Sequence, residues 1–231
     1  MKKKNFLFAV LTLAALSAGL VSCESDNLKD SSKNHEWVDL GLPSGLKWAT
    51  CNVGATTPEE YGNYYAWGET TTKETYSLAT YKWCNGSYDT QTKYNTSNIY
   101  CTVDNKTVLE LADDAARANW GGAWRMPTDG EWGELLEECT WEWKNAYKGT
   151  TTGYLVTSKT NGNSIFLPAA GYHSNDALGS AGDSGYCGYY WSSSLDADGP
   201  DGAWYVSFGS DGVSRYGSYR CLGLSVRPVC K

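Results

Sequence analysis

The segment Trp124–Trp132, with the sequence WRMPTDGEW, concentrates the residue types that active sites use. Catalysis there would require a nucleophile or an activated base, and the segment offers no obvious one. Structural roles account for it better. Thr128 and Glu131 have the spacing of a helix capping box, Pro127 would stiffen the helix entry, and Arg125 can bind carbonyls or acids. We therefore expect a structural clasp rather than a catalytic site.

A second group that could do chemistry is the acidic loop Asp196, Asp198 and Asp201. Its carboxylates could donate oxygens to a hard cation such as Ca²⁺. A loop of the EF-hand kind, however, would need a ligand where Pro200 stands and a closing Glu where Ser207 stands. The loop is therefore predicted to be a solvated turn, and no metal or other cofactor is expected.

The N-terminal end has the order of a secretory signal: a basic start at Met1–Lys4, a charge-free and mostly apolar run at Phe6–Leu20, and a small-residue end before Cys23. A Cys directly after Ser22 resembles the lipobox of bacterial lipoproteins, in which that Cys is acylated. Residues 1–22 are thus predicted to be a lipoprotein signal peptide, residues 23–35 a flexible tether, and residues 36–231 one folded domain. The alternative is an ordinary signal whose Cys23 joins a disulfide.

Charge and composition restrict the partners. Removal of the leader takes away three lysines, so 16 of the 19 basic residues remain against 26 acidic ones. The mature chain therefore carries a formal charge near −10. This argues against nucleic acid and anionic lipid surfaces, which select basic patches. The only expected membrane contact is the N-terminal lipid. Eleven Trp, 17 Tyr and 25 Gly favour short strands and loops around an aromatic core.

The predicted order of elements is a hairpin or strand pair within residues 37–50, then two helices, then a run of strands. The first helix is expected at residues 107–118, with Val108, Leu111, Ala112 and Ala115 on one face. The second is expected at residues 129–139 or slightly beyond, with Trp132, Leu135 and Leu136 buried. Strands are predicted at residues 154–157, 164–168, 188–193, 203–208 and 224–229. This order predicts an α+β fold with mostly antiparallel strands.

The segment after the predicted hairpin turn Ser210–Gly212 has a composition that is poor for a core. Residues 213–220 contain one aliphatic residue among Tyr, Ser, Gly and Arg. Tyr supplies rigid amphipathic area and Ser and Gly supply adaptability, as in antibody binding loops. Exposed aromatic residues on loops favour ligand binding. The alternative is a Gly- and Tyr-rich loop that only closes the fold.

Several motifs carry a resemblance to a known family. The clasp resembles a signature of C-type lectin-like domains that occurs in the formylglycine-generating enzyme superfamily and in the Fibrobacter succinogenes major paralogous domain family. The N-terminal stretch Val38–Ala55 and the end, with Tyr190–Ser194 and Ser225–Val229, closely resemble the second family. This resemblance implies a C-type lectin-like fold in which the first and last strands pair, in a cell-envelope lipoprotein of the outer membrane, on its surface or its periplasmic face.

The resemblance also helps to distinguish an enzyme, a calcium-dependent lectin and a diversified binding protein. The enzyme branch uses two closely spaced cysteines that bind copper, whereas here Cys221 has no partner until Cys230. The calcium-lectin motifs Glu-Pro-Asn, Gln-Pro-Asp and Trp-Asn-Asp are absent from the sequence. In similar lipoproteins a diversity-generating retroelement rewrites the last exposed segment, whereas many relatives are fixed paralogues without a retroelement. The resemblance then implies a ligand-binding set comprising Asp196, Asp198, Asp201, Tyr205, Ser207, Ser214, Arg215, Tyr216, Ser218 and Tyr219.

Seven cysteines remain if Cys23 is lipidated, an odd number in a chain expected to be exported. Pairing of the terminal strands, as the resemblance implies, would bring Cys51 near Cys230. The hypothesis then pairs Cys84 with Cys101 and Cys187 with Cys221, and leaves Cys139 unpaired.

Three functions follow as alternatives. The first is a non-enzymatic lipoprotein that binds a protein or glycan ligand through its C-terminal surface. The second is an oxidase of the formylglycine-generating type, and the third a structural or adhesin component of a surface assembly.

Overall fold

The computed structural model describes residues 35–175, 177–178 and 183–231. The described residues all belong to the second of the chain's two units, Ser31–Lys231. The predicted signal peptide, the lipidated Cys23 and the tether up to residue 34 lie outside the described residues. Among the residues described, no helix is long and apolar enough to cross a membrane.

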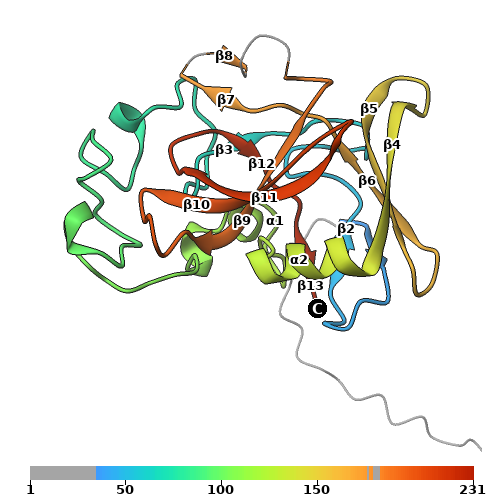
Figure 1. The fold of residues 1–231 in the computed structure, drawn as a ribbon, viewed down its shortest axis with the longest axis horizontal. Helices are drawn as coiled ribbons and strands as arrows, with labels where there is room; N and C mark the ends of the chain where they lie inside the picture. Colours follow the sequence, from blue (N-terminus) through green and yellow to red (C-terminus); the bar gives the residue numbers. More distant parts are fainter. Residues whose placement is uncertain (1–34, 176, 179–182) are drawn as a thin grey trace, which may run out of the picture. The chain divides into compact units, whose positions relative to one another are not determined.

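The second unit is an α+β domain with mostly antiparallel strands and two α-helices among its described residues, in agreement with the predicted class (Figure 1). Its largest sheet has five strands in the order β11-β10-β9-β12-β3. These are β11 (Gly212–Tyr219), β10 (Gly202–Gly209), β9 (Gly188–Leu195), β12 (Leu224–Ser225) and β3 (Tyr64–Tyr65).

The two ends of the domain share a smaller sheet, β1-β2-β13. It comprises β1 (Trp37–Asp39), β2 (Lys47–Ala49) and β13 (Val229–Cys230). The last strand pairs antiparallel with β2, with Val229 opposite Trp48. The expected joining of the termini is present, but the partner of the last strand is the second strand of the N-terminal hairpin and not the first.

A third sheet, β4-β5-β6, stands beside the five-stranded sheet (Figure 1). Its strands are β4 (Cys139–Tyr147), β5 (Thr151–Ser158) and β6 (Ser164–Pro168). The remaining pair is β7 (His173–Ser174) with β8 (Ala177–Leu178). Short 3-10 turns cover Leu78–Thr80, Asn98–Tyr100 and Leu111–Asp113.

The first helix differs from its prediction. Helix α1 spans only Ala115–Trp120, because the side chain of Asp114 caps it by accepting a hydrogen bond from the Arg117 amide. Residues 107–109 instead pair with β9: the Leu109 amide donates to the Ser193 carbonyl at 2.9 Å. Val108 and Leu111 are consequently 45% and 53% exposed, so the predicted apolar face does not exist.

The second helix, α2, spans Asp129–Glu138 and is capped as predicted. The Thr128 hydroxyl accepts from the Glu131 amide, and the Glu131 carboxylate accepts from the Thr128 amide. Trp132 and Leu135 are buried, whereas Leu136 is half-buried. The helix does not continue past residue 138, since Cys139 begins β4, a strand that the sequence prediction lacked.

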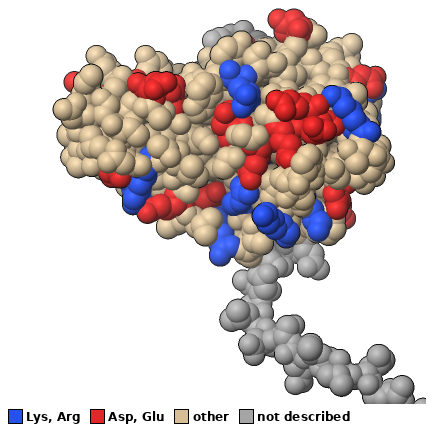
Figure 2. All heavy atoms as spheres, turned by 60° about the horizontal axis from the view of Figure 1, so that its bottom comes forward, with Lys and Arg blue, Asp and Glu red and all other residues tan. Residues whose placement is uncertain are grey.

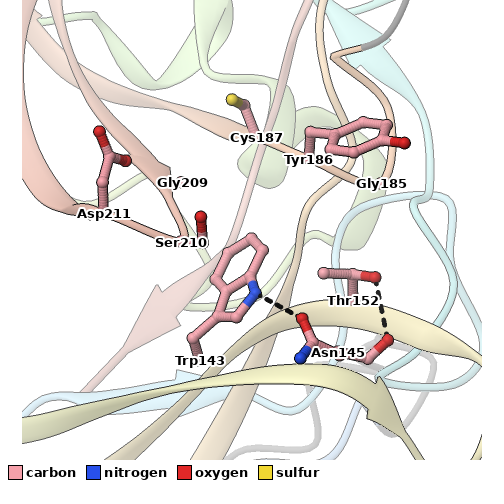
Figure 3. A pocket seen from close by; sticks show the side chains of 9 residues that line it. All are labelled: Trp143, Asn145, Thr152, Gly185, Tyr186, Cys187, Gly209, Ser210 and Asp211. Atoms are coloured by element: carbon pink, nitrogen blue, oxygen red, sulfur yellow. Dashed lines mark hydrogen bonds between the residues drawn. The ribbon is translucent and has the colours of Figure 1, made fainter.

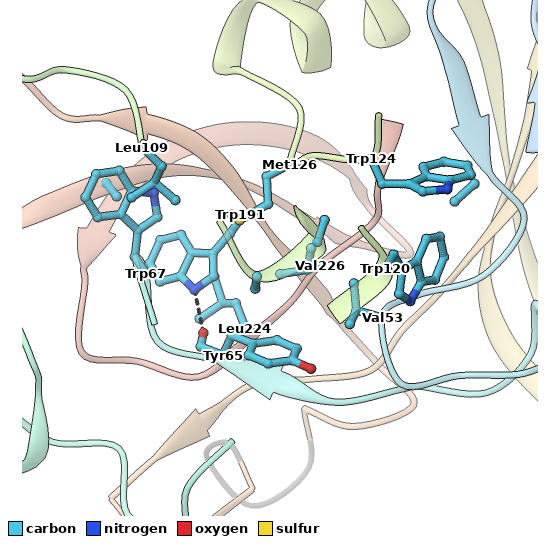
Figure 4. Packing of buried hydrophobic residues seen from close by; sticks show 14 of the residues in the cluster. Val53, Tyr65, Trp67, Leu109, Trp120, Trp124, Met126, Trp191, Leu224 and Val226 are labelled. Carbon is cyan, nitrogen blue, oxygen red and sulfur yellow. Dashed lines mark hydrogen bonds between the residues drawn. The ribbon is translucent and has the colours of Figure 1, made fainter. Parts of the chain in front are cut away.

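Two aromatic cores pack on the two faces of the five-stranded sheet. Along β9, Trp191 enters one core and Tyr190 the other, as the alternation of a strand requires. In the first core the Trp191 indole donates to the Tyr65 carbonyl at 2.8 Å (Figure 4). In the second, Trp132 of α2 packs against Trp48 of β2. The sheet that carries the predicted binding segment is thus fixed from both sides.

Candidate binding surface

The polar groups of the clasp, Trp124–Trp132, form hydrogen bonds within the protein. The Arg125 guanidinium binds both oxygens of the Glu131 carboxylate, at 2.6 and 2.7 Å. The Arg125 backbone pairs with Val229 of β13, and the Pro127 carbonyl accepts from the Ser193 amide at 2.7 Å. The segment therefore ties α2 to the last strand and to β9, as expected of a clasp.

The predicted binding set lies mainly on the hairpin of β10 and β11. The predicted turn is present, with Gly209 opposite Gly212. Tyr205 lies opposite Tyr216, and Ser207 lies opposite Ser214. Opposed residues of an antiparallel pair share one face, and Ser218, opposite Ala203, lies on that face too. Five of the ten predicted residues are therefore brought together.

Two tyrosines that the sequence reasoning missed extend this face. Tyr189 of β9 lies opposite Ser207, and Tyr172 precedes β7. The ring centroids are 5.0 Å apart for Tyr172 and Tyr189, 6.1 Å for Tyr189 and Tyr205, and 6.2 Å for Tyr205 and Tyr216. We call Tyr172, Tyr189, Tyr205 and Tyr216 the tyrosine row. The alternation of Tyr189 with the core residue Tyr190 was a signal that could have identified it.

Exposure increases toward the edge of the sheet. Tyr172, Tyr189 and Tyr205 are half-buried, whereas Tyr216 on the edge strand is 52% exposed. Burial raises the pKa of Tyr189 and of Tyr205, so these hydroxyls stay protonated near neutral pH. A hollow of about 250 Å³ lies among Tyr172, Tyr189, Tyr205 and Ser218. The row thus combines aromatic area with neutral hydroxyl groups.

Arg215 is not part of this face. It lies opposite Val206, which belongs to the second core, and its Nη1 donates to the Asp129 carboxylate at 2.7 Å and to the Asp129 carbonyl at 3.1 Å. The guanidinium lies close to Gly133 of α2. Arg215 therefore tethers the edge strand to α2.

The acidic residues and Tyr219 form a separate group at the other end of the hairpin. A hollow of about 230 Å³ is lined by Asp196, Asp201 and Tyr219. Asp198, exposed in the same turn, donates its amide to the Asp196 carboxylate at 3.3 Å. Burial raises the pKa of Asp201, to which Tyr100 hydrogen-bonds. In the described parts of the chain, no group of three or more His, Cys, Asp or Glu side chains could hold a metal ion.

The structure joins none of the predicted cysteine pairs, because all seven cysteines of its described residues are free thiols. Cys51 and Cys230 share the first core, as the pairing of the chain ends implied, but no bond joins them. Cys84 and Cys101 flank Gln91 on two sides, about two strand spacings or 10 Å apart. This separation exceeds the roughly 7 Å that a disulfide spans between Cα atoms.

Cys187 and Cys221 also have different surroundings. Cys187 lies beside Gly209 at the hairpin turn, whereas Cys221 packs with Cys84 in a small buried cluster. Cys139, which the sequence left unpaired, is a buried free thiol at the start of β4.

A family model described as a domain of unknown function (DUF8237) matches residues 149–229. The matched range begins just before β5, ends at the first residue of β13, and includes the whole tyrosine row. No curated protein and no solved structure matches the chain.

Proposed function

We propose that this protein is a non-enzymatic, lipid-anchored protein of the cell envelope that binds a protein or glycan ligand through the tyrosine row. The row itself is the observation that carries the proposal. Four tyrosines from three strands and a loop make successive ring contacts, and the outermost is more than half exposed. Such rigid aromatic area, with a low entropic cost of ordering, is typical of recognition surfaces.

The finer fold belongs to the same proposal: a C-type lectin-like domain of the Fibrobacter succinogenes major paralogous domain family. The sheet shared by the two ends supports it, as does the position of the residues that carry the resemblance. Arg227 of the C-terminal motif is fully buried, and its guanidinium donates to Asn52 of the N-terminal motif at 2.9 Å. The two motifs thus contact each other directly.

Two observations support binding over oxidase chemistry. Cys221 and Cys230 pack in different buried clusters, so their sulfurs do not converge as a copper-binding thiolate pair requires. In the clasp, the Arg125 and Glu131 side chains bind each other.

Charge supports a partner that is not a polyanion. Helix α2 alone carries five acidic residues, Asp129, Glu131, Glu134, Glu137 and Glu138. On the face shown in Figure 2, acidic side chains gather in a central patch with Lys and Arg around it, and that face has no continuous basic area. We therefore propose that the protein does not bind nucleic acid. Its membrane contact would be through a lipid on Cys23 alone.

The function is tested by presenting the mature protein to a glycan array and a displayed peptide library. We expect the ligand retained by the wild type to be lost with Tyr216→Ala, because this ring is the most exposed of the row. Tyr88→Ala is the matched control, since Tyr88 is equally exposed, at 54%, but lies outside the row. Equal loss in both variants, or retention by Tyr216→Ala, contradicts the proposal.

Diversification by a retroelement is the sharper form of the proposal. Sequencing the codons for residues 186–231 across a population grown from one cell tests it. Diversification predicts substitutions at Tyr205 and Tyr216, with the buried neighbours Val206 and Phe208 unchanged. An invariant segment would instead identify a fixed surface for a single cognate ligand.

A further inference from the structure

A wide hollow lies next to the hairpin turn of β10 and β11. It measures about 770 Å³ and is bordered by Trp143 and Asn145 of β4, Thr152 of β5, Tyr186 before β9, and Ser210 and Asp211 of the turn (Figure 3). We call it the turn groove. None of these six residues belongs to the binding set predicted from the sequence.

The wall of the groove on β4 and β5 is held in place before any ligand arrives. The Trp143 indole donates to the Asn145 side-chain oxygen at 3.0 Å (Figure 3). Its ring packs edge-on against that of Tyr154, with the ring centroids 5.1 Å apart. The Thr152 hydroxyl donates to the Asn145 carbonyl at 3.1 Å. An aromatic side chain fixed in this way loses little conformational entropy on binding.

The opposite wall leaves its aromatic ring free to contact a ligand. Tyr186 is 70% exposed, the most exposed tyrosine of the described chain. Large exposed aromatic residues on soluble proteins mark interaction sites when they border a concave surface. Together, Trp143 and Tyr186 give the groove two aromatic surfaces.

The turn groove continues into the tyrosine row. Cys187, Gly209 and Asp211 border it and also border a neighbouring hollow of about 230 Å³. That second hollow extends to Ser214 and Tyr216. A single extended ligand can therefore contact the groove and the row together.

The charge of the lining selects the ligand class. The groove contains one carboxylate, on Asp211, and neither Lys nor Arg. Burial raises the pKa of Cys187, so its thiol is neutral there. A phosphate, sulfate or uronate group would lose its hydration without gaining a counter-charge. An anionic ligand is therefore disfavoured.

The remaining polar groups match a sugar better than a peptide. Hydroxyl, amide and carboxylate side chains can form hydrogen bonds with the adjacent hydroxyls of a sugar ring, while aromatic rings pack against the apolar face of the sugar. A peptide bound by its main chain would instead pair with an edge strand such as β4 or β11, and it is the competing outcome of the test below. We propose that the turn groove and the tyrosine row together bind a neutral oligosaccharide chain, an inference that rests on the proposed ligand-binding function.

The test is a calorimetric titration of the mature protein with neutral gluco-, manno-, xylo- and galacto-hexasaccharides. At least one should bind, and Tyr186→Ala and Asp211→Asn should each weaken it tenfold or more. Both side chains are exposed, so these variants should fold normally, with unchanged thermal unfolding as the check. Trp37→Ala, at an exposed Trp outside the groove, is the control and should bind like the wild type.

The outcomes separate the two proposals. If no neutral sugar binds, or if a hexauronate binds as tightly as its neutral counterpart, the glycan inference is overturned. Peptide ligands that are lost with Tyr216→Ala but retained by Tyr186→Ala would overturn this inference while leaving the proposed function intact.

A second, independent inference concerns two buried thiols. Cys84 and Cys221 pack in one cluster with Ala66, Tyr76 and Tyr81, and both are more than nine-tenths buried. Burial, with a smaller effect of the neighbouring Cys84, raises the pKa of the Cys221 thiol to about 11. The thiols are therefore inert toward exchange once the cluster is closed.

We infer that Cys84 and Cys221 form a disulfide during folding outside the cytoplasm. Each thiol loses a proton and an electron as the S–S bond forms, and a protein or small-molecule disulfide takes up both electrons and becomes two thiols. The bond would link the long segment between β3 and α1 to the connection between β11 and β12. It differs from both pairings that the sequence suggested for these residues.

Peptide mapping without reductant, on the full chain exported by a bacterial host, tests this inference. We expect a cross-linked peptide joining Cys84 and Cys221, with Cys139 alkylated. Cys84→Ala and Cys221→Ala should lower the thermal midpoint by similar amounts, and the double variant should lower it no further. Complete alkylation of both thiols in the unfolded wild type, or a cross-link to another cysteine, overturns it.

Discussion

The clasp and the tyrosine row contrast in how their side chains are used. The clasp contains the charged residues that suggest chemistry, yet Arg125 and Glu131 bind each other and Trp132 is fully buried. The tyrosine row contains no charged residue, yet its outermost member, Tyr216, is 52% exposed. Residue type alone is therefore a poor guide to a site. What matters is whether the fold has already satisfied the polar groups.

The largest difference between the two regions should appear in stability. Trp132 packs against Trp48 and donates its indole N–H to the Trp191 carbonyl. Trp132→Ala should therefore cost about 3–5 kcal/mol of unfolding free energy, measured by denaturant titration. Tyr216→Ala should cost less than about 1 kcal/mol. Similar costs for the two would remove the distinction between clasp and row.

A smaller effect is expected from the charge of the clasp, and it should depend on pH. Burial alone would raise the pKa of Glu131, but hydrogen bonds from Arg125 and the Thr128 amide hold it below its usual 4.5. Glu131→Gln should therefore cost about 2 kcal/mol at pH 7. A lowered pKa in the folded state stabilises the protein above pH 4.5, and this contribution is lost as the pH falls through the lower folded value.

Unfolding curves measured between pH 7 and pH 3 test this. The free energies of unfolding of the wild type and Glu131→Gln should converge at low pH. Glu142→Gln is the control, because Glu142 is exposed and pairs only with Lys144 on the surface. Its cost should stay below about 1 kcal/mol. A gap between the wild type and Glu131→Gln that is independent of pH would show that the carboxylate charge does not stabilise the clasp.

The smallest effect should come from Arg215, which the structure assigns to the scaffold. Its ion pair with Asp129 is partly exposed, so Arg215→Ala should cost about 0.2–1 kcal/mol. Ligand affinity should be unchanged, since the guanidinium lies on the opposite face of the hairpin from Tyr216. Calorimetry with the array-identified ligand measures this, and a tenfold loss would place Arg215 in the binding surface.

Local signals predicted part of the fold well. The capping box at Thr128, the strand at residues 164–168 and the hairpin turn at Ser210–Gly212 were readable because neighbouring residues decide them. The first helix failed because Leu109 pairs with β9, a partner more than 80 residues away. The strand β4 was missed even though Trp141 and Trp143 alternate with polar residues, because it follows α2 without a break.

The site was predictable only in composition. The segment after Ser210 was recognisable as a poor core, but the register that selects Tyr216 and excludes Arg215 is a property of the paired strands. Tyr172 joins the row from a distant loop, and Trp143 borders the turn groove from a strand that was not expected. The cysteine pairing failed for the same reason, since register decides which thiols meet.

The most direct test of the contrast is a mutational scan of residues 124–132 and 202–219, sorted separately for folded protein on the cell surface and for binding of the array-identified ligand. Substitutions in the clasp should remove folded protein and binding together. Substitutions at Tyr205 and Tyr216 should remove binding while folded protein remains. Clasp variants that fold normally but no longer bind would place the functional site in WRMPTDGEW and contradict this account.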